Sequence, residues 1–199
     1  MFCIVTALKE ELQPFIKRLQ ISAPPETPAG GALYKTDRVH LLQAGLGPKL
    51  SAETLDLYLK KYTPEFLLNA GLAGALTAGT EIERIYRISD VISGWNGNSL
   101  SLYLRDEFAG LPSARLITVE EAVTDRRRRD ELVKRYHAHL VDMEAYALAE
   151  TARQYDIPFY CLKIVSDFAD EKAVETVLRK YKILCNRLAE YTLKTINVE

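Results

Sequence analysis

The segment Pro158 to Asp170, with the sequence PFYCLKIVSDFAD, decides the fold class. Its first part, Pro158 to Val165, is a nearly continuous apolar run of the length of one strand. Such runs are typical of strands covered on both faces, which occur mainly where helices pack on a parallel sheet. Polar residues follow at once from Ser166. The segment therefore indicates an α/β protein with polar groups at the carboxyl end of an interior strand, where ligands bind in open α/β sheets.

The rest of the chain alternates between strand and helix patterns. The other expected strands are Phe2 to Thr6, a hairpin of Ala32 to Asp37 with Arg38 to Ala44, Glu65 to Asn69, Ile82 to Ser93, Arg115 to Val119 and His137 to Val141. The expected helices are Lys9 to Leu19, Ser51 to Tyr62, Thr124 to Tyr136, Met143 to Tyr155 and a long one from Val174 onward. A glycine-rich loop is expected at Gly71 to Gly74, and a polar, irregular segment at Gly94 to Pro112. This order predicts one α/β domain over residues 1–199, with a mixed, largely parallel central sheet flanked by helices.

Composition and charge exclude several classes of protein. The 199 residues are 48% hydrophobic and 27% charged, as in an ordinary globular chain. The net charge of -1 provides no positive field for nucleic acid or an anionic membrane surface. No apolar stretch reaches the roughly 18 residues that a membrane span needs, and the amino-terminal run is too short for a secretion signal. The three cysteines, widely spaced and odd in number, predict buried, reduced thiols in a cytoplasmic protein.

Three carboxylates come shortly after predicted strands and are the candidates for chemistry. Asp167 follows the apolar strand directly, so it is either a general acid or a cap for the final helix. Glu144 begins a helix and either stabilises the helix dipole or holds ligand hydroxyls. Glu11 opens the first helix, where dipole stabilisation is again the ordinary explanation. Residue types and spacing alone leave these alternatives open.

Other motifs predict no cofactor or metal. The run Arg126 to Arg129 precedes Asp130 and Glu131 on a predicted helix and indicates a solvated, partly self-paired face. His137 and His139 share a face but lack further zinc ligands at suitable spacing. The segment Gly45 to Gly47 lacks the third glycine of a dinucleotide-binding fingerprint, and no phosphate-binding GxxxxGK[ST] motif occurs.

Four motifs in order give the chain a family resemblance: ALKEEL at 7–12, NAGLAG at 69–74, VDMEA at 141–145 and SDFAD at 166–170. Together they resemble the nucleoside phosphorylase superfamily, and within it the methylthioadenosine/S-adenosylhomocysteine nucleosidases. The resemblance implies hydrolysis of the N-glycosidic bond of a purine nucleoside, most simply a 5′-modified adenosine, without metal or organic cofactor. It also implies a homo-oligomer, expected to be a dimer, and a small-molecule nucleoside as the only kind of ligand.

The resemblance also implies a role for each site residue. Asp167 protonates the leaving purine at N7 and Ser166 orients it. Glu144 holds the ribose hydroxyls, Met143 packs on the sugar, and Glu11 positions or deprotonates the attacking water. Such a set suits an oxocarbenium-like transition state, which gains from an acid on the leaving group and carboxylates beside the sugar. Ala73 and Gly74 of the glycine segment, and Val123, would line the same pocket.

The chain departs from the family pattern at three places. Leu72 stands where a small hydroxyl residue is usual, and Val123 stands where an aromatic side chain stacks on the base. The segment between Ser93 and Arg115 is shorter than in typical members, so we expect the 5′ side of the pocket to be open or completed by another subunit. The alternatives are a phosphate-dependent phosphorylase, for which Lys49, Arg84 and Arg87 are available, a futalosine-type nucleosidase, and a non-catalytic nucleoside-binding member.

Overall fold

A mixed β-sheet forms the centre of the protein in the computed structural model, which describes residues 1–27 and 31–198. Over these residues the strand order is β2-β3-β1-β4-β8-β7-β5-β6, and β9 pairs with both β4 and β5. The strands are β1 Phe2–Thr6, β2 Ala32–Lys35, β3 Val39–Gln43, β4 Leu67–Ala75, β5 Ile85–Ser93, β6 Ser99–Ser101, β7 Ser113–Thr118, β8 Leu140–Asp142 and β9 Phe159–Asp167. Of the nine pairings among them, five are parallel and four antiparallel. The expected mixed, largely parallel sheet is confirmed.

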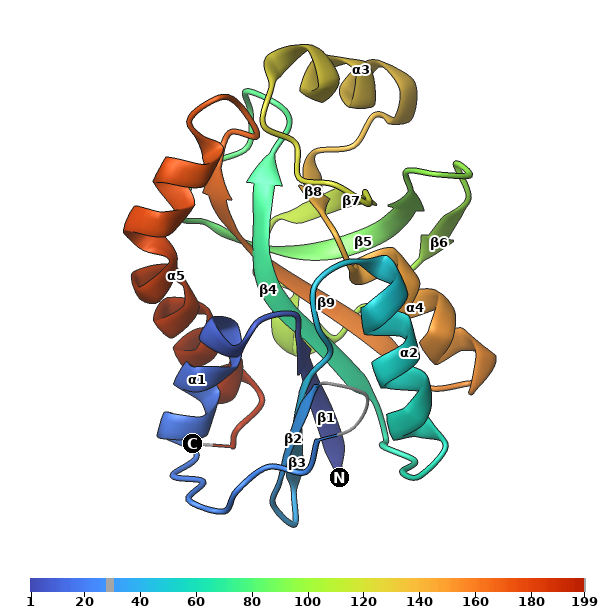
Figure 1. Ribbon diagram of the computed structural model, residues 1–199, viewed down its shortest axis with the longest axis vertical. Coiled ribbons are helices and arrows are strands. Elements are labelled where there is room, and N and C mark those ends of the chain that lie inside the picture. Colours follow the sequence, from blue (N-terminus) through green and yellow to red (C-terminus); the bar gives the residue numbers. More distant parts are fainter. Residues whose placement is uncertain (28–30, 199) are drawn as a thin grey trace.

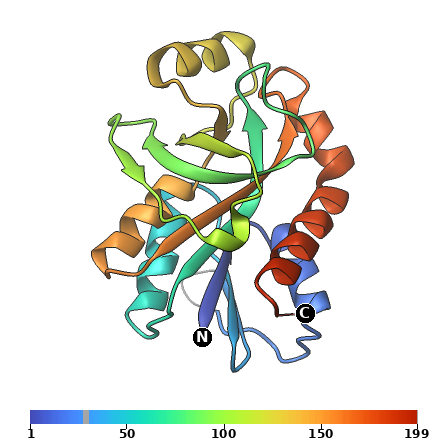
Figure 2. The same ribbon diagram turned by 180° about the vertical axis from the view of Figure 1, so that it is seen from behind.

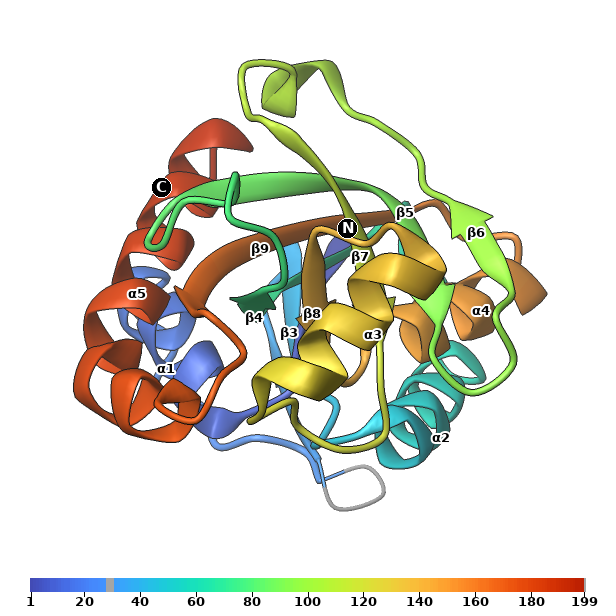
Figure 3. The same ribbon diagram turned by 90° about the horizontal axis from the view of Figure 1, so that it is seen from above.

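Helices cover both faces of this sheet (Figure 1). They are α1 Lys9–Arg18, α2 Pro48–Leu59, α3 Arg126–Tyr136, α4 Ala145–Gln154 and α5 Ala173–Thr195, with a short 3-10 turn, η1, at Asp106–Phe108. Helices α1 and α5 pack together on one side, and α2 packs with α4 on the other, as the reverse view also shows (Figure 2). The apolar side chains of each helix pair join those of the sheet in a separate core cluster. Helix α3 lies across one end of the sheet and has no buried residue (Figure 3).

The segment chosen to decide the fold lies in the interior. Strand β9 is buried at every position except Tyr160, and it continues through Ser166 to Asp167, two residues beyond the predicted end. Its long parallel pairing with β4 accounts for this extension, because the pairing resumes between Gly74 and Asp167 after a register shift at Ala73 and Gly74. The polar residues Ser166 and Asp167 therefore belong to the strand and not to a loop.

The predicted glycine loop is wrong. Gly71 to Gly74 belong to β4, which runs unbroken from Leu67 to Ala75 between β9 and β8. Glycine usually weakens a strand, but here neighbouring strands supply backbone hydrogen bonds and two side chains approach where a Cβ would stand. A Cβ on Gly71 would lie 2.8 Å from Glu11 Oε1, and one on Gly74 would lie 3.2 Å from Asp167 Oδ1. Because these two glycines have no side chain, the carboxylates of Glu11 and Asp167 can lie close to the backbone of β4.

Most other predicted elements are present with shifted ends. Helix α2 begins at Pro48, three residues early, because proline fits the first turn of a helix. Strand β8 is shorter than predicted, since His137 takes the left-handed conformation (φ 51°) as the C-cap of α3. Asp125 caps α3 by accepting a hydrogen bond from the Arg128 amide at 2.9 Å.

The arginine run of α3 is partly self-paired, as predicted. Each of its members lies within 4 Å of an acidic group: Arg126 of Glu171, Arg127 of Glu131, Arg128 of Glu121 and Arg129 of Asp130. The three cysteines are free and buried, and burial raises the pKa of each thiol to about 12. Of the helices described, none has the length and apolar character that crossing a membrane requires.

Candidate active site

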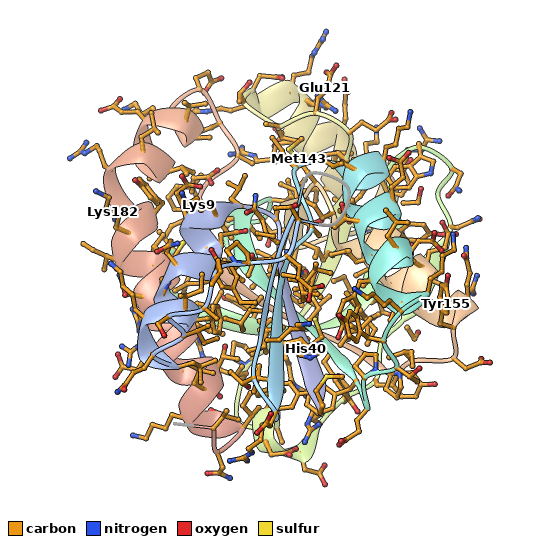
Figure 4. All side chains as sticks on the ribbon, turned by 60° about the horizontal axis from the view of Figure 1, so that its bottom comes forward. Lys9, His40, Glu121, Met143, Tyr155 and Lys182 are labelled. Carbon is orange, nitrogen blue, oxygen red and sulfur yellow. The ribbon has the colours of Figure 1, made fainter. Side chains whose placement is uncertain are left out.

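A cavity of about 310 Å³ opens where β1, β4, β8 and β9 end and where α1, α4 and α5 begin. Glu11, Glu144 and Asp167 all line it, although they come from distant parts of the sequence. The other predicted site residues also line it, namely Ala73, Gly74, Val123, Met143 and Ser166. Met143 lies centrally at this end of the sheet in Figure 4, whereas Glu121 lies at the periphery. The structure thus brings the whole predicted set together.

Glu11 is held by three backbone amides. Its Oε2 accepts hydrogen bonds from the amides of Ala7 and Leu8, each at 3.0 Å, and its Oε1 accepts one from the Leu72 amide at 2.9 Å. The first two bonds are the local stabilisation of a helix start that the sequence suggested. The third joins α1 to β4 and fixes the carboxylate, which is buried, at the cavity wall.

Asp167 does not cap the final helix. Its Oδ1 accepts a hydrogen bond from the Ala169 amide at 2.7 Å, and Ser166 Oγ lies 2.5 Å from its Oδ2. Helix α5 begins only at Ala173, and Asp170 accepts the Lys172 amide next to that start. The capping alternative for Asp167 is therefore wrong. Its carboxyl group is buried at the cavity and oriented by its own turn.

Glu144 turns away from the helix that it precedes. Its Oε1 accepts a hydrogen bond from the Gly47 amide at 2.9 Å, and it makes no side-chain cap with α4. Burial, followed by the negative charge of Asp142, raises its pKa from an ordinary 4.5 to about 8, although Lys163 and the Gly47 amide act in the opposite direction. Glu144 therefore takes up a proton more readily than an ordinary glutamate, and in its protonated form it can donate as well as accept a hydrogen bond.

A buried ion pair under the cavity was not anticipated from the sequence. Lys163 of β9 donates to Asp142 Oδ2 at 2.9 Å, and the two side chains are only 3% and 1% exposed. Asp142 also accepts hydrogen bonds from Thr118 Oγ1 at 2.7 Å and from the Ala145 amide at 3.0 Å. Burial, the largest single influence, lowers the pKa of Lys163, but the combined attraction of Asp142 and the other acidic groups around it outweighs burial, so the pKa lies above its usual range. A lysine inside an otherwise apolar strand was the available signal.

Apolar side chains form the rest of the cavity wall. Leu72 and Val123, the two departures from the family pattern, both line it. At the mouth the lining residues are exposed: Leu46 to 55%, Val174 to 59% and Leu178 to 68%. Residues 1–27 and 31–198 hold no group of three or more His, Cys, Asp or Glu side chains arranged to bind a metal ion. The arrangement suits a small ligand with an apolar part and hydroxyl groups that meet carboxylates.

Comparison with known proteins gives consistent relatives. A family model described as the phosphorylase superfamily matches residues 1–122 and 111–197. A 5′-methylthioadenosine/S-adenosylhomocysteine nucleosidase from Staphylococcus saprophyticus is 25% identical, with 98% of this chain and 100% of the relative covered. The enzyme of the same name from Bacillus subtilis is 26% identical, with 85% of this chain and 87% of the relative covered.

Solved structures share the fold at low sequence identity. The 5′-methylthioadenosine/S-adenosylhomocysteine nucleosidase of Helicobacter pylori, bound to butyl-thio-DADMe-Immucillin-A, has a TM-score of 0.91 and 16% identity over 98% of this chain and 97% of its own. A futalosine hydrolase structure from Helicobacter pylori has a TM-score of 0.90, 16% identity and the same coverage. The family model spans nearly the whole chain, and the solved structures share its fold. The chain belongs to the phosphorylase superfamily.

Proposed function

We propose that this protein hydrolyses the N-glycosidic bond of a purine nucleoside, with a 5′-modified adenosine of the methylthioadenosine or S-adenosylhomocysteine type as substrate. The observation that carries the proposal is that Glu11, Glu144 and Asp167 are all buried and line one cavity. The names of the relatives, nucleosidases acting on those two compounds, support the choice of substrate.

Asp167 is the general acid in this proposal. Protonation at N7 turns the purine from a poor anionic leaving group into a neutral one. The Ala169 amide and Ser166 hydroxyl fix the carboxyl group from two sides, and Ser166 Oγ also lies 3.2 Å from the carbonyl oxygen of Ala73. The acid therefore needs little reorganisation once substrate is bound, which is the condition for efficient proton transfer.

The sugar lies between the other carboxylates in this proposal. Glu144 binds the ribose hydroxyls, Met143 packs on the sugar, and Glu11 positions or deprotonates the attacking water. As the glycosidic bond breaks, positive charge develops on the sugar, and buried carboxylates stabilise it more strongly than they would in water. The purine takes the part of the cavity lined by Ala73, Gly74 and Val123. Val123 supplies apolar contact there without aromatic stacking.

Water is the proposed nucleophile because the anion donors of the cavity are occupied. The amides of Ala7, Leu8 and Leu72 bind Glu11, and the Gly47 amide binds Glu144. A phosphate bound in the cavity would face these carboxylates, which repel it, and would find no free hydrogen-bond donors among these amides.

The cations considered for phosphate binding lie elsewhere. Lys49, Arg84 and Arg87 are absent from the cavity lining; Arg84 pairs with Glu81, and Arg87 donates to the Leu111 carbonyl. Lys163, whose charge lowers the pKa of Glu144, is already paired with Asp142. Phosphorolysis is thus the weaker alternative.

The open mouth supports a homo-oligomer in which a second copy of the chain covers the 5′ side. Leu46, Val174 and Leu178 line the cavity and remain largely exposed, which is unfavourable for an isolated subunit. A dimer that buries them would complete the pocket for an apolar 5′ group. Sedimentation analysis is expected to give a dimer, and Leu178→Glu is expected to dissociate it; a wild-type monomer at micromolar concentration contradicts this arrangement.

The free thiols support a cytoplasmic location.

A substrate panel tests the proposed function. Adenosine, inosine, methylthioadenosine, S-adenosylhomocysteine and futalosine are incubated with purified protein, and free base is measured with and without phosphate. We expect adenine from a 5′-modified adenosine at a rate that phosphate does not change. Strict phosphate dependence would identify a phosphorylase, preference for futalosine would identify the other nucleosidase type, and binding without cleavage would identify a non-catalytic member.

A further inference from the structure

The turn after β9 contains one peptide group that is hydrogen-bonded at both ends. Its N–H, from Ala169, donates to Asp167 Oδ1 at 2.7 Å. Its C=O, from Phe168, accepts a hydrogen bond from Arg129 Nη1 at 3.3 Å. Because the two groups belong to one rigid planar unit, the guanidinium group and the carboxylate are connected through a single peptide.

The turn is tightly constrained on the Asp167 side. Ala169 is buried and has a φ of 49°, a left-handed conformation that is uncommon for residues other than glycine. It also packs closely on β4, since a Cβ added at Gly74 would lie 3.2 Å from Ala169 Cβ and 3.2 Å from Asp167 Oδ1. A conformation of this kind persists only where surrounding contacts determine it.

Arg129 comes from a helix that is otherwise peripheral. Helix α3 has no buried residue, yet the Arg129 side chain is only 22% exposed, against 90% for Arg127 on the same helix. Its Nε also bonds Asp130 at 3.1 Å, which orients the guanidinium plane. Arg126 makes a second contact with the same loop, at 3.4 Å from Glu171. Helix α3 therefore meets the Asp167 turn through arginines.

We propose that Arg129 is a positioning residue for Asp167, acting through the Phe168–Ala169 peptide. Hydrogen bonds in series polarise one another, so donation to the Phe168 carbonyl strengthens donation from the Ala169 amide to the carboxylate. Rotation of the peptide would withdraw the amide from Asp167 and leave the carboxyl group free to turn away from the base. The catalytic part of this inference rests on the proposed function, in which Asp167 is the general acid.

Activity measurements test the catalytic part. Arg129→Gln is expected to lower kcat by about tenfold with a much smaller change in KM, because misplacement of a catalytic group reduces turnover before binding. Arg127→Gln removes the same charge from the same helix and is expected to leave kcat unchanged. Arg129→Lys keeps a charged donor of similar length, unlike the shorter, neutral glutamine, and is expected to recover part of the loss. In an Asp167→Asn background, Arg129→Gln should cause no further loss, whereas a general structural role would lower activity by the same factor in both backgrounds.

Amide hydrogen exchange tests the hydrogen-bonded relay, meaning the two hydrogen bonds that join Arg129 to Asp167 through the Phe168–Ala169 peptide, without relying on activity. By NMR, Arg129→Gln is expected to accelerate exchange of the Ala169 amide by about tenfold, while Arg127→Gln leaves it unchanged, because a weaker local structure opens more often. Should the Gln variant fail to fold, the Lys variant carries the same comparison with an intermediate effect. Unchanged exchange at Ala169 in a folded Arg129 variant overturns the inference. A wild type that cleaves no nucleoside overturns the proposed function instead, and the exchange result still decides the relay.

Discussion

Replacing Asp167 by asparagine separates proton transfer from structural support. Asparagine keeps an oxygen at Oδ1, which can still accept a hydrogen bond from the Ala169 amide. In the native protein this amide lies 2.7 Å from Asp167 Oδ1. At the other position its NH₂ group can donate to Ser166 Oγ, which then donates to the Ala73 carbonyl, 3.2 Å away. Every hydrogen bond of the native turn thus has a replacement in the variant. The proton available to the leaving base has none.

The expected loss follows from that difference. General acid catalysis contributes on the order of 10² to 10⁴ in rate, roughly 3 to 5 kcal/mol, so turnover should fall by about that factor. Because each hydrogen bond of the turn has a replacement, the free energy of unfolding should fall by no more than about 1 kcal/mol. For a chain of this size that corresponds to a fall in Tm of about 2–4 °C. Base release gives turnover, and thermal unfolding gives stability, on the same preparation.

A matched variant controls for the loss of negative charge in this loop. Asp170→Asn makes the same chemical change three residues later, at a side chain that accepts the Lys172 amide and lies outside the cavity lining. It should lower stability slightly and leave turnover unchanged. Wild-type turnover in Asp167→Asn, under conditions where the wild type cleaves a nucleoside, would refute the assignment of this residue as the acid.

Three other changes test the carboxylate cluster. The pKa of about 8 for Glu144 means that the folded protein still binds a proton that the unfolded chain releases near pH 4.5. The free energy of unfolding should therefore fall as the pH rises between these two values. Glu144→Gln should flatten this pH dependence in chemical denaturation, and an unchanged slope would count against the raised pKa. Lys163→Met leaves its buried partner unpaired and should destabilise the protein by about 3–5 kcal/mol in urea unfolding, whereas a loss below about 1 kcal/mol would show that the pair is solvated. Gly71→Ala places a Cβ 2.8 Å from Glu11 Oε1 and should reduce kcat by at least about tenfold. The control variant Gly79→Ala, whose Cβ has no atom within 4 Å, should leave kcat unchanged. Equal activities of the two variants would mean that Glu11 can move without consequence for catalysis.

Periodicity predicted elements well where one structural cause dominates. The strand Phe2–Thr6 has its predicted bounds because a short apolar run placed directly before an amphipathic helix leaves little choice. The prediction of a loop at Gly71 to Gly74 is wrong, because glycine clusters usually mark turns. Here the glycines stand within a strand, at positions where side chains from other elements approach the backbone closely. Strand β9 was predicted to stop at its last apolar residue, whereas its pairing with β4 continues into the polar residues.

The candidate site was predictable to the extent that its residues follow strand ends. Glu11, Glu144 and Asp167 were identified by that position and by motif order, and the structure places all three at one cavity. The hydrogen-bond partners were not predictable, because amides such as those of Gly47 and Leu72 carry no side-chain signature. Their role depends on which strands become neighbours, and that is a property of the folded sheet.

The acidic composition of the cavity has a thermodynamic consequence for its function. Glu11, Asp142, Glu144 and Asp167 are all buried, and Lys163 is the one cation shown to pair with any of them in the described structure. Burying a carboxylate without full compensation is unfavourable, and the raised pKa of Glu144 is the visible result. The same unfavourable energy is relieved when a positive charge arises among these groups, as it does on the sugar when a glycosidic bond breaks. A site arranged in this way interacts more strongly with the transition state than with the neutral substrate, which is the requirement for catalysis.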